Sequence, residues 1–261
     1  MSENPHQHVD GATLGAEAAD HGEPSPAADP ALLEDLVAAN AILARHGVVD
    51  AFGHISVRHP EAGDRFLLAR NMAPGLVSAG DIVEFDLDSN PVTARGRKIY
   101  LERYIHAEIY RTRPDVHSVV HSHAPAVVPF AAVPSVPLQA IWHMSGFLGE
   151  RVPIFEIREI AGEDSDLLIR SRALGAALAA SLGAKPVVLM RGHGATVVGT
   201  SIKEVVFRAV YTQVNAEIQL QAAALGPVNY LSAGECRSTT ASVGSQVDRA
   251  WDLWKREVRE G

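Results

Sequence analysis

Three histidines of this chain stand where they could hold one divalent metal ion. His121 and His123 follow two valines, and side chains two residues apart along a strand point to the same face of a sheet. His193 lies between two glycines after the apolar run 187–190, which favours a ligand at a strand end over a core histidine. The alternatives are an exposed pair of histidines and a turn with an incidental histidine. Three imidazoles would leave coordination positions open for water or substrate.

The identity of the ion is open. The chain has a single cysteine, Cys236, so a site built from several thiolates is excluded. Imidazole ligands are compatible with zinc, manganese, iron and cobalt. We therefore expect one divalent metal per subunit, drawn from these four.

The carboxylate expected beside the metal is Glu102, at the start of a predicted helix over 101–114. A helix start shortly before the His-x-His strand would bring this carboxylate near the ion, where it could act as an acid or a base. If Glu102 is the acid, desolvation is expected to raise its pKa. The alternative reading of the spacing is a glutamate that only stabilises the helix N-terminus.

Hydrophobic periodicity and turn residues place these groups on a series of elements. We predict helices over 31–47, 101–114, 164–183, 201–226 with Ser201 as the N-cap, and around 250–258, and a short helix with loop over 126–140. We predict strands over 52–60, 65–70, 81–92 with a turn inside it, 117–124, 152–157, 185–194 and 195–199. Strands and helices mix without strict alternation. The fold class is therefore α/β, with a mainly antiparallel or mixed central sheet flanked by helices.

Composition limits the domain count and the partners. Residues 1–28 almost lack large apolar groups and are predicted to be a disordered tail in which His6 and His8 are solvated. Residues 29–261 would form one catalytic domain with a C-terminal helical tail. The net charge of −8 argues against nucleic acid or an anionic membrane as partner. A lone cysteine, with no secretory signal and no membrane-spanning apolar run, indicates a cytoplasmic protein.

The motifs around the candidate ligands resemble the class II aldolase/adducin family. The similarity covers nearly all of residues 31–225, and its specific part is the run E-x3-H-x3-Y-x2-R-P-D-x3-V-V-H-x-H-A followed by G-H-G. The resemblance implies a single-domain α/β/α sandwich and a homotetramer with sites at subunit interfaces. It also implies metal ligation by His121, His123 and His193, and an acid/base role for Glu102.

Departures from the sugar-phosphate aldolases of this family are informative. Those enzymes bind the substrate phosphate with a G-N-x-S strand, a T-P-S/T-G turn and a Ser-Ser pair before the glutamate. Here the matching residues include His54 in place of the asparagine, and Tyr100 and Leu101 in place of the serine pair. A phosphate needs several hydrogen-bond donors or a cationic clamp. A phosphorylated substrate is therefore disfavoured.

The same stretches are similar to the decarboxylase branch of the family. The matching segments are 53–58, 70–77, 230–235 and 251–254. Members of that branch act on hydroxylated aromatic or pyridine dicarboxylates and on carboxylated muconic semialdehydes. One departure is Gly75, where many relatives have a glutamate, and this replacement bears on substrate selection.

The function that we predict is a metal-dependent lyase of aromatic compound catabolism. It would decarboxylate a hydroxylated aromatic, pyridine or related hydroxy or keto acid through an enolate-type intermediate that the metal stabilises, with Glu102 as acid/base. One alternative is an aldolase that cleaves a non-phosphorylated hydroxy-keto substrate. A second is a non-catalytic adducin-like scaffold, which should have lost the ligands that this chain keeps.

A small-molecule carboxylate substrate also needs groups that bind it. Arg70 and Arg191 adjoin turns that are predicted to lie at the site, and a guanidinium can bind a carboxylate through two parallel hydrogen bonds. His54 and His106 could contact the substrate or support the ligands, and Tyr230 could close the site, as could His143. Surface ion pairs for the arginines and structural roles for the histidines are the alternatives.

Overall fold

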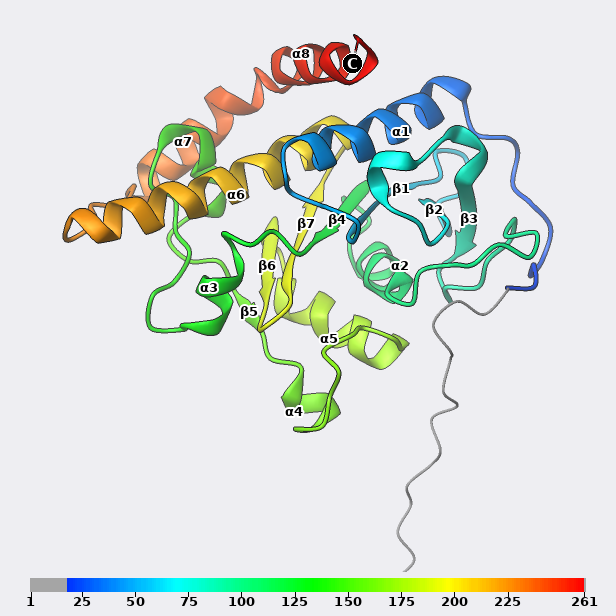
Figure 1. The fold of residues 1–261 in the computed structure, drawn as a ribbon, viewed down its shortest axis with the longest axis horizontal. Helices are drawn as coiled ribbons and strands as arrows, with labels where there is room; N and C mark the ends of the chain where they lie inside the picture. Colours follow the sequence, from blue (N-terminus) through cyan, green and yellow to red (C-terminus); the bar gives the residue numbers. More distant parts are fainter. Residues whose placement is uncertain (1–17, 261) are drawn as a thin grey trace, which may run out of the picture.

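The structure is a computed structural model that describes residues 18–260. Within these residues the centre is a seven-stranded sheet with the strand order β3-β2-β1-β4-β7-β6-β5 (Figure 1). Neighbouring strands are antiparallel except β5 and β6, which are parallel. The strands are β1 (His54–Arg58), β2 (Arg65–Ala69), β3 (Ile82–Asp86), β4 (Ser118–Ser122), β5 (Ile154–Phe155), β6 (Val187–Met190) and β7 (Gly194–Gly199). The predicted mixed sheet is confirmed.

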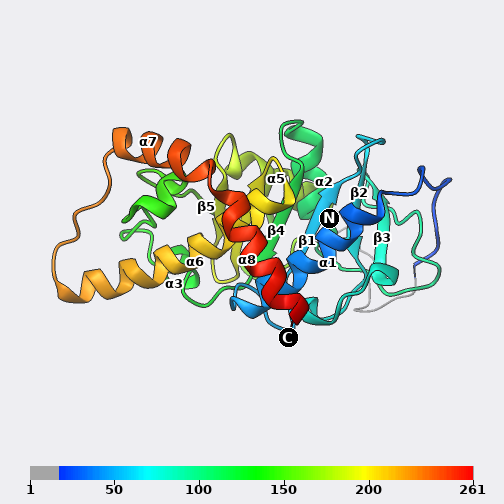
Figure 2. The same ribbon diagram turned by 90° about the horizontal axis from the view of Figure 1, so that it is seen from above.

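Helices cover both faces of this sheet (Figures 1 and 2). One face is covered by α1 (Pro30–Arg45), α6 (Ile202–Leu225) and α8 (Val247–Glu260), and the other by α2 (Arg103–Thr112) and α5 (Arg172–Leu182). Adjacent residues of β4 point into different layers, because Val120 packs in the core with α1 and Val119 packs in the core with α2. The predicted α/β/α sandwich is confirmed.

The remaining helices lie in the connections between these elements. They are α3 (Val128–Ala132), α4 (Arg158–Ala161) and α7 (Ala233–Gly244), with the 3-10 helices η1 (Pro74–Leu76), η2 (Ala79–Asp81) and η3 (His143–Leu148). We did not predict α7, although its start has a local signal: Ser232 and Glu235 form a capping box. Gly75, in η1, is exposed at the surface.

Two helix starts show how capping decides the boundaries. The predicted N-cap Ser201 accepts a hydrogen bond from the backbone N–H of Glu204. The helix predicted over 164–183 instead begins at Arg172, because Ser171 accepts from the backbone N–H of Leu174 and caps it there. Residues 163–171 form a loop before this helix, and this loop reaches the candidate site.

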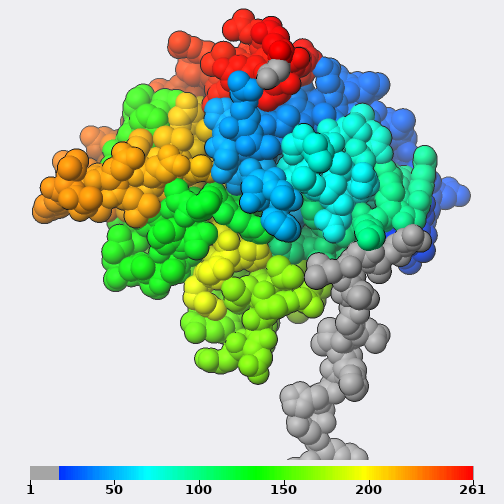
Figure 3. Space-filling model, viewed as in Figure 1, coloured from blue at the N-terminus to red at the C-terminus, as the bar shows by residue number. Residues whose placement is uncertain are grey.

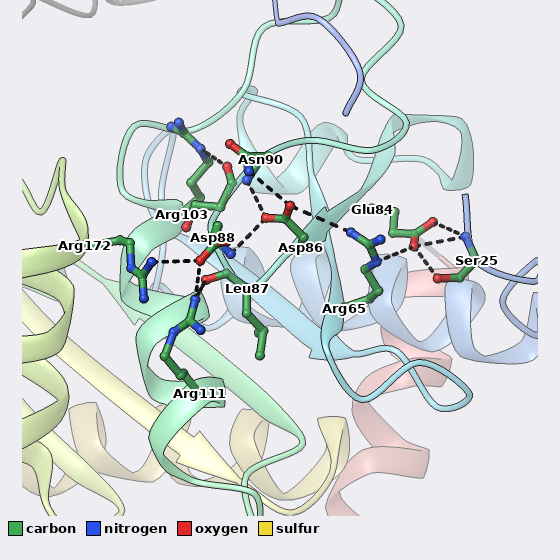
Figure 4. A network of polar contacts seen from close by, with 11 residues as sticks. Ser25, Arg65, Glu84, Asp86, Leu87, Asp88, Asn90, Arg103, Arg111 and Arg172 are labelled. Atoms are coloured by element: carbon green, nitrogen blue, oxygen red, sulfur yellow. Dashed lines mark hydrogen bonds and ion pairs between the residues drawn. The ribbon is translucent and has the colours of Figure 1, made fainter. Parts of the chain in front are cut away.

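Residues 18–28, which the sequence places in the predicted tail, have no regular secondary structure and contact β3 and the segment after it. Ser25 donates from its backbone N–H and its hydroxyl to Glu84 on β3 (Figure 4), and the backbone N–H of His21 donates to the carbonyl of Pro91. These contacts give this part of the segment a defined path. His6 and His8 lie outside the described residues.

The C-terminal helix α8 lies across α1, which Figure 3 shows from one side. Its buried Trp251 and Trp254 belong to the same hydrophobic core as residues of α1 and α6, and Lys255 Nζ lies 2.5 Å from Asp35 Oδ1. The predicted C-terminal helix is therefore packed on the domain rather than extended from it. No helix of residues 18–260 has both the length and the apolar content that a bilayer crossing requires.

Candidate metal centre

The ends of four strands meet at the candidate centre. His121 lies near the end of β4 and pairs with His54, the first residue of β1. His193 lies in the tight turn between β6 and β7, so it comes beside the end of β4, where Ser122 pairs with Ala195. The turn needs a glycine at its exit, because a Cβ at Gly194 would collide with the backbone carbonyl of Ser122.

The three predicted ligands converge on one point. His121 Nε2 lies 3.0 Å from His123 Nε2, and His193 Nε2 lies 2.9 Å from His123 Nε2. Glu102 Oε2 is 3.4 Å from His121 Nε2 and 3.5 Å from His193 Nε2. One ligand atom from each of the four side chains therefore lies within 4.8 Å of the other three.

These spacings fit a divalent cation. Two nitrogens bound at right angles, each about 2.0–2.1 Å from one ion, are about 2.9 Å apart. The Nδ1 of His193 lies 2.9 Å from the carbonyl oxygen of Leu167; since a carbonyl only accepts, Nδ1 carries the proton and Nε2 keeps a free lone pair. His121, His123, His193 and Glu102 are thus the residues that could hold a metal.

Charge in the cluster is set by burial and by the single carboxylate. Burial lowers the pKa of His121, and burial together with the neighbouring imidazoles lowers the pKa of His123 to about 4. At His193, burial lowers the pKa, but hydrogen bonding and attraction from Glu102 outweigh it and raise the pKa. Neutral imidazoles are the form that binds metals.

The expectation of a raised pKa for Glu102 is wrong. Burial does act to raise it, but attraction and hydrogen bonds from His121 and His193 outweigh burial and hold the pKa well below its usual range. The expectation counted desolvation and left out the imidazoles that face this carboxylate. Glu102 is therefore a carboxylate in the resting protein.

The loop 163–171 fixes the orientation of two of these side chains. The backbone N–H of Ile169 donates to Glu102 Oε1 over 2.9 Å, which turns Oε2 toward the histidines. Two residues earlier, the carbonyl of Leu167 binds His193. We did not predict this role, because backbone donors and acceptors leave no side-chain signal in the sequence.

A cavity of about 500 Å³ opens beside the cluster. Its lining comes from residues 51–54, 71–73 and 100–102, together with His123 and Leu168. The Tyr100 hydroxyl donates to the backbone carbonyl of Met72, so its ring forms a wall, with the ring centre 4.5 Å from that of His54. Phe52, 65% exposed, lies at the rim. The described residues that line the cavity include no lysine or arginine.

The other predicted substrate contacts lie elsewhere in this chain. Arg70 Nε lies 2.6 Å from Asp81 Oδ1, and Arg191 Nε lies 2.6 Å from Glu156 Oε2 without the alignment of a hydrogen bond. Neither arginine lines the cavity, because each is held by an acidic residue.

The remaining candidates divide between the cavity wall and more distant positions. His54 lines the cavity, and His106 is fully buried behind it. Tyr230 binds Gln219 on α6 through its hydroxyl, and His143 lines a separate groove beside α6 and α8. The fold thus brings His54 to the metal cluster, and leaves Tyr230 and His143 outside the cavity of their own chain.

Comparison with known proteins agrees with this geometry. A sequence profile described as the class II aldolase and adducin N-terminal domain matches residues 34–220. The decarboxylase TropJ of Talaromyces stipitatus is 47% identical, over 84% of this chain and 91% of that protein. A 3,4-dihydroxyphthalate decarboxylase of Arthrobacter keyseri is 32% identical, over 77% of this chain and 83% of that protein.

A solved structure shows the same fold. The L-fuculose 1-phosphate aldolase of Glaciozyma antarctica superposes with a TM-score of 0.73 over 91% of this chain and 96% of that one, at 23% identity. At this identity the likeness shows the fold alone, whereas the two sequence relatives named above are decarboxylases. The chain therefore belongs to the class II aldolase and adducin family and is one of its carbon–carbon lyases.

Proposed function

We propose that this chain decarboxylates a hydroxylated aromatic carboxylic acid with one divalent metal held by His121, His123 and His193. The observation that carries the proposal is the convergence of three imidazole nitrogens and one anionic carboxylate beside a cavity with aromatic walls. The names of the relatives support the reaction, since one acts on 3,4-dihydroxyphthalate. When bound, the cation supplies Lewis-acid stabilisation of the charge that remains after CO2 leaves.

Glu102 moves the proton in this proposal. As a carboxylate of low pKa, it begins as a base and accepts the proton of the substrate hydroxyl. When the bond to the carboxylate carbon breaks, CO2 leaves, and the electron pair stays on the ring carbon. Glu102 then returns its proton to that carbon, and the hydroxyl proton is restored from solvent. Ile169 keeps Oε2 directed at the reacting group throughout, because it occupies Oε1.

The cavity favours a flat, unphosphorylated substrate. Tyr100 and Phe52 offer aromatic surface, which suits a ring by stacking. Without a lysine or arginine among the described lining residues, one chain offers a phosphate no cationic clamp. We further propose a homotetramer in which a neighbouring copy covers the open rim at Phe52 and supplies Tyr230 there.

The test is a product assay on the metal-loaded protein. We expect CO2 from ortho-hydroxylated benzoates and dihydroxyphthalates, and none from the same acids without the hydroxyl. The assay should be repeated with Zn²⁺, Mn²⁺, Fe²⁺ and Co²⁺. If no acid releases CO2 but a non-phosphorylated hydroxy-keto acid yields an aldehyde, the chain is an aldolase and the proposal is wrong.

A further inference from the structure

A buried chain of hydrogen bonds runs from the cavity wall into the core. His54 Nδ1 lies 2.7 Å from His106 Nε2, and His106 Nδ1 lies 2.6 Å from Ser56 Oγ. Ser56 Oγ lies 2.7 Å from the hydroxyl of Tyr110. All four side chains are at most 3% exposed, so neighbouring protein groups, rather than bulk water, satisfy these atoms.

Local structure explains why the four side chains meet. His54 and Ser56 are two residues apart on β1 and point to the same face of the sheet. His106 and Tyr110 are four residues apart on α2 and point to the same side of the helix. The packing of α2 on β1 therefore aligns two pairs of polar groups, which we call the relay.

Only one order of donation along the relay gives every donor hydrogen of the four side chains an acceptor or leaves it facing the cavity. Burial raises the pKa of Tyr110, and its phenol keeps its proton. Among residues 18–260, Ser56 Oγ is the acceptor within reach of that proton. Donation then passes from Tyr110 to Ser56, from Ser56 to His106 Nδ1, and from His106 Nε2 to His54 Nδ1. In the opposite direction the buried phenol proton would have no acceptor, which is costly.

This direction fixes the tautomer of His54. Because Nδ1 accepts from His106, the proton of the neutral ring sits on Nε2. Nε2 makes no hydrogen bond to the described residues, and the ring lines the cavity beside Glu102 and His123. We propose that the relay makes His54 a fixed hydrogen-bond donor to the substrate, selecting acids with an acceptor oxygen at this wall of the cavity.

The substrate part of this inference rests on the proposed function, and the tautomer part does not. The first test is long-range ¹⁵N–¹H NMR on the zinc-loaded protein with ¹⁵N-labelled histidine, with His54 assigned through His54→Gln. We expect a protonated Nε2 and a bare Nδ1. A protonated Nδ1 on His54 in the wild-type protein would overturn the relay, whichever substrate the enzyme uses.

Two serines make a matched pair of variants. Ser56→Ala breaks the relay, whereas Ser118→Ala removes a fully buried serine on β4 whose hydroxyl donates to the backbone carbonyl of Ser56. We expect Ser56→Ala to give a mixture of His54 tautomers and to raise KM roughly tenfold, with metal content unchanged. Ser56→Thr, which keeps the hydroxyl, should restore both readouts.

Ser118→Ala should leave the tautomer and KM as they are in the wild type. Equal rises in KM for the Ser118 and Ser56 variants without a change of tautomer would show that the serines are merely structural. If no acid tested is a substrate, the tautomer of His54 in the wild type and in Ser56→Ala still decides whether the relay exists.

Discussion

Helix α2 carries two buried glutamates that have very different surroundings. Glu102, at its N-cap, is 7% exposed and faces His121 and His193. Glu108, six residues later, is 3% exposed and lies 3.3 Å from Arg111 and 3.1 Å from Arg172. Both carboxylates are out of water, but arginines compensate only the second.

The second glutamate belongs to a network that is complete in itself. The arginine network comprises Asp88, Glu108, Arg111 and Arg172. Asp88 Oδ1 lies 2.7 Å from Arg111 and 2.9 Å from Arg172 (Figure 4). Each of its acidic side chains contacts two guanidinium groups, which ties the turn after β3 to α2 and α5. A buried carboxylate with permanent cations beside it is a structural group.

The surroundings of Glu102 are different in kind. Its neighbours are imidazoles whose free nitrogens point at the same place as its own oxygen. Like-charged or lone-pair groups converge in this way where a cation binds between them. The comparison indicates that arginines compensate the charge of Glu108, whereas the cluster at Glu102 has the ligand atoms that could hold a metal.

The largest expected effect is the loss of the metal in His193→Ala. One imidazole fewer weakens the cluster and removes a ligand from the tight β6–β7 turn, so we expect no stoichiometric metal and no measurable CO2 release. Elemental analysis of the purified variant checks this. His143→Ala replaces an exposed histidine outside the cavity and should keep both. Full metal content in His193→Ala would remove this ligand from the site.

The next effect separates the two glutamates. Glu102→Gln should keep the folded structure and lower kcat by about a hundredfold or more, the loss typical of a general acid or base. Glu108→Gln should keep kcat within a few-fold and lower the free energy of unfolding by about 1–2 kcal/mol, because two arginines lose a charged partner. Steady-state kinetics and urea unfolding give the two readouts. Equal kinetic losses in both variants would contradict the comparison.

The buried ring of His106 should make the folded protein less stable in acid. Burial lowers the pKa of His106 to about 3, against a usual value of 6.5. Above pH 6.5 the ring is neutral in both the folded and the unfolded chain. Below pH 6.5 the unfolded chain takes up a proton that the folded chain does not, so the free energy of unfolding decreases as the pH is lowered. In metal-free protein, His106→Gln should make this fall less steep between pH 6.5 and 5. The free energy of unfolding is measured by urea unfolding at each pH. If its pH dependence in His106→Gln equals that of the wild type, this ring does not contribute to the loss of stability in acid.

The smallest expected effect is at the edge of the arginine network. Arg172 is the first residue of α5 and follows the loop that binds Glu102 and His193. Because this side chain is about half exposed, Arg172→Met should cost about 0.5–1 kcal/mol of unfolding free energy. It should also lower kcat slightly by loosening the loop, while metal content stays at the wild-type value. A loss of metal would mean that the network and the metal site are not separable.

Much of the site was predictable because its chemistry is local in sequence. The two-residue spacing of His121 and His123 on an apolar strand fixes a shared face, and the glycines beside His193 mark a tight turn. The two-residue spacing of His54 and Ser56 has the same kind of consequence, but it becomes meaningful only when α2 lies against it.

The rest depends on contacts between distant segments. No sequence pattern shows that Asp81 and Glu156 hold Arg70 and Arg191 away from the cavity. The backbone groups of loop 163–171 that orient Glu102 and His193 could not be predicted for the same reason. Ser171, which ends this loop and caps α5, fell inside the helix predicted over 164–183. The wrong expectation for the pKa of Glu102 arose because its neighbours were not yet known.

The most direct test of the metal-dependent lyase is CO2 release from a hydroxylated aromatic acid, measured as metal is added back to stripped protein. We predict no release without metal and a rate that rises in proportion to occupancy until one ion is bound per chain. Undiminished release by protein shown to contain no metal would contradict the account.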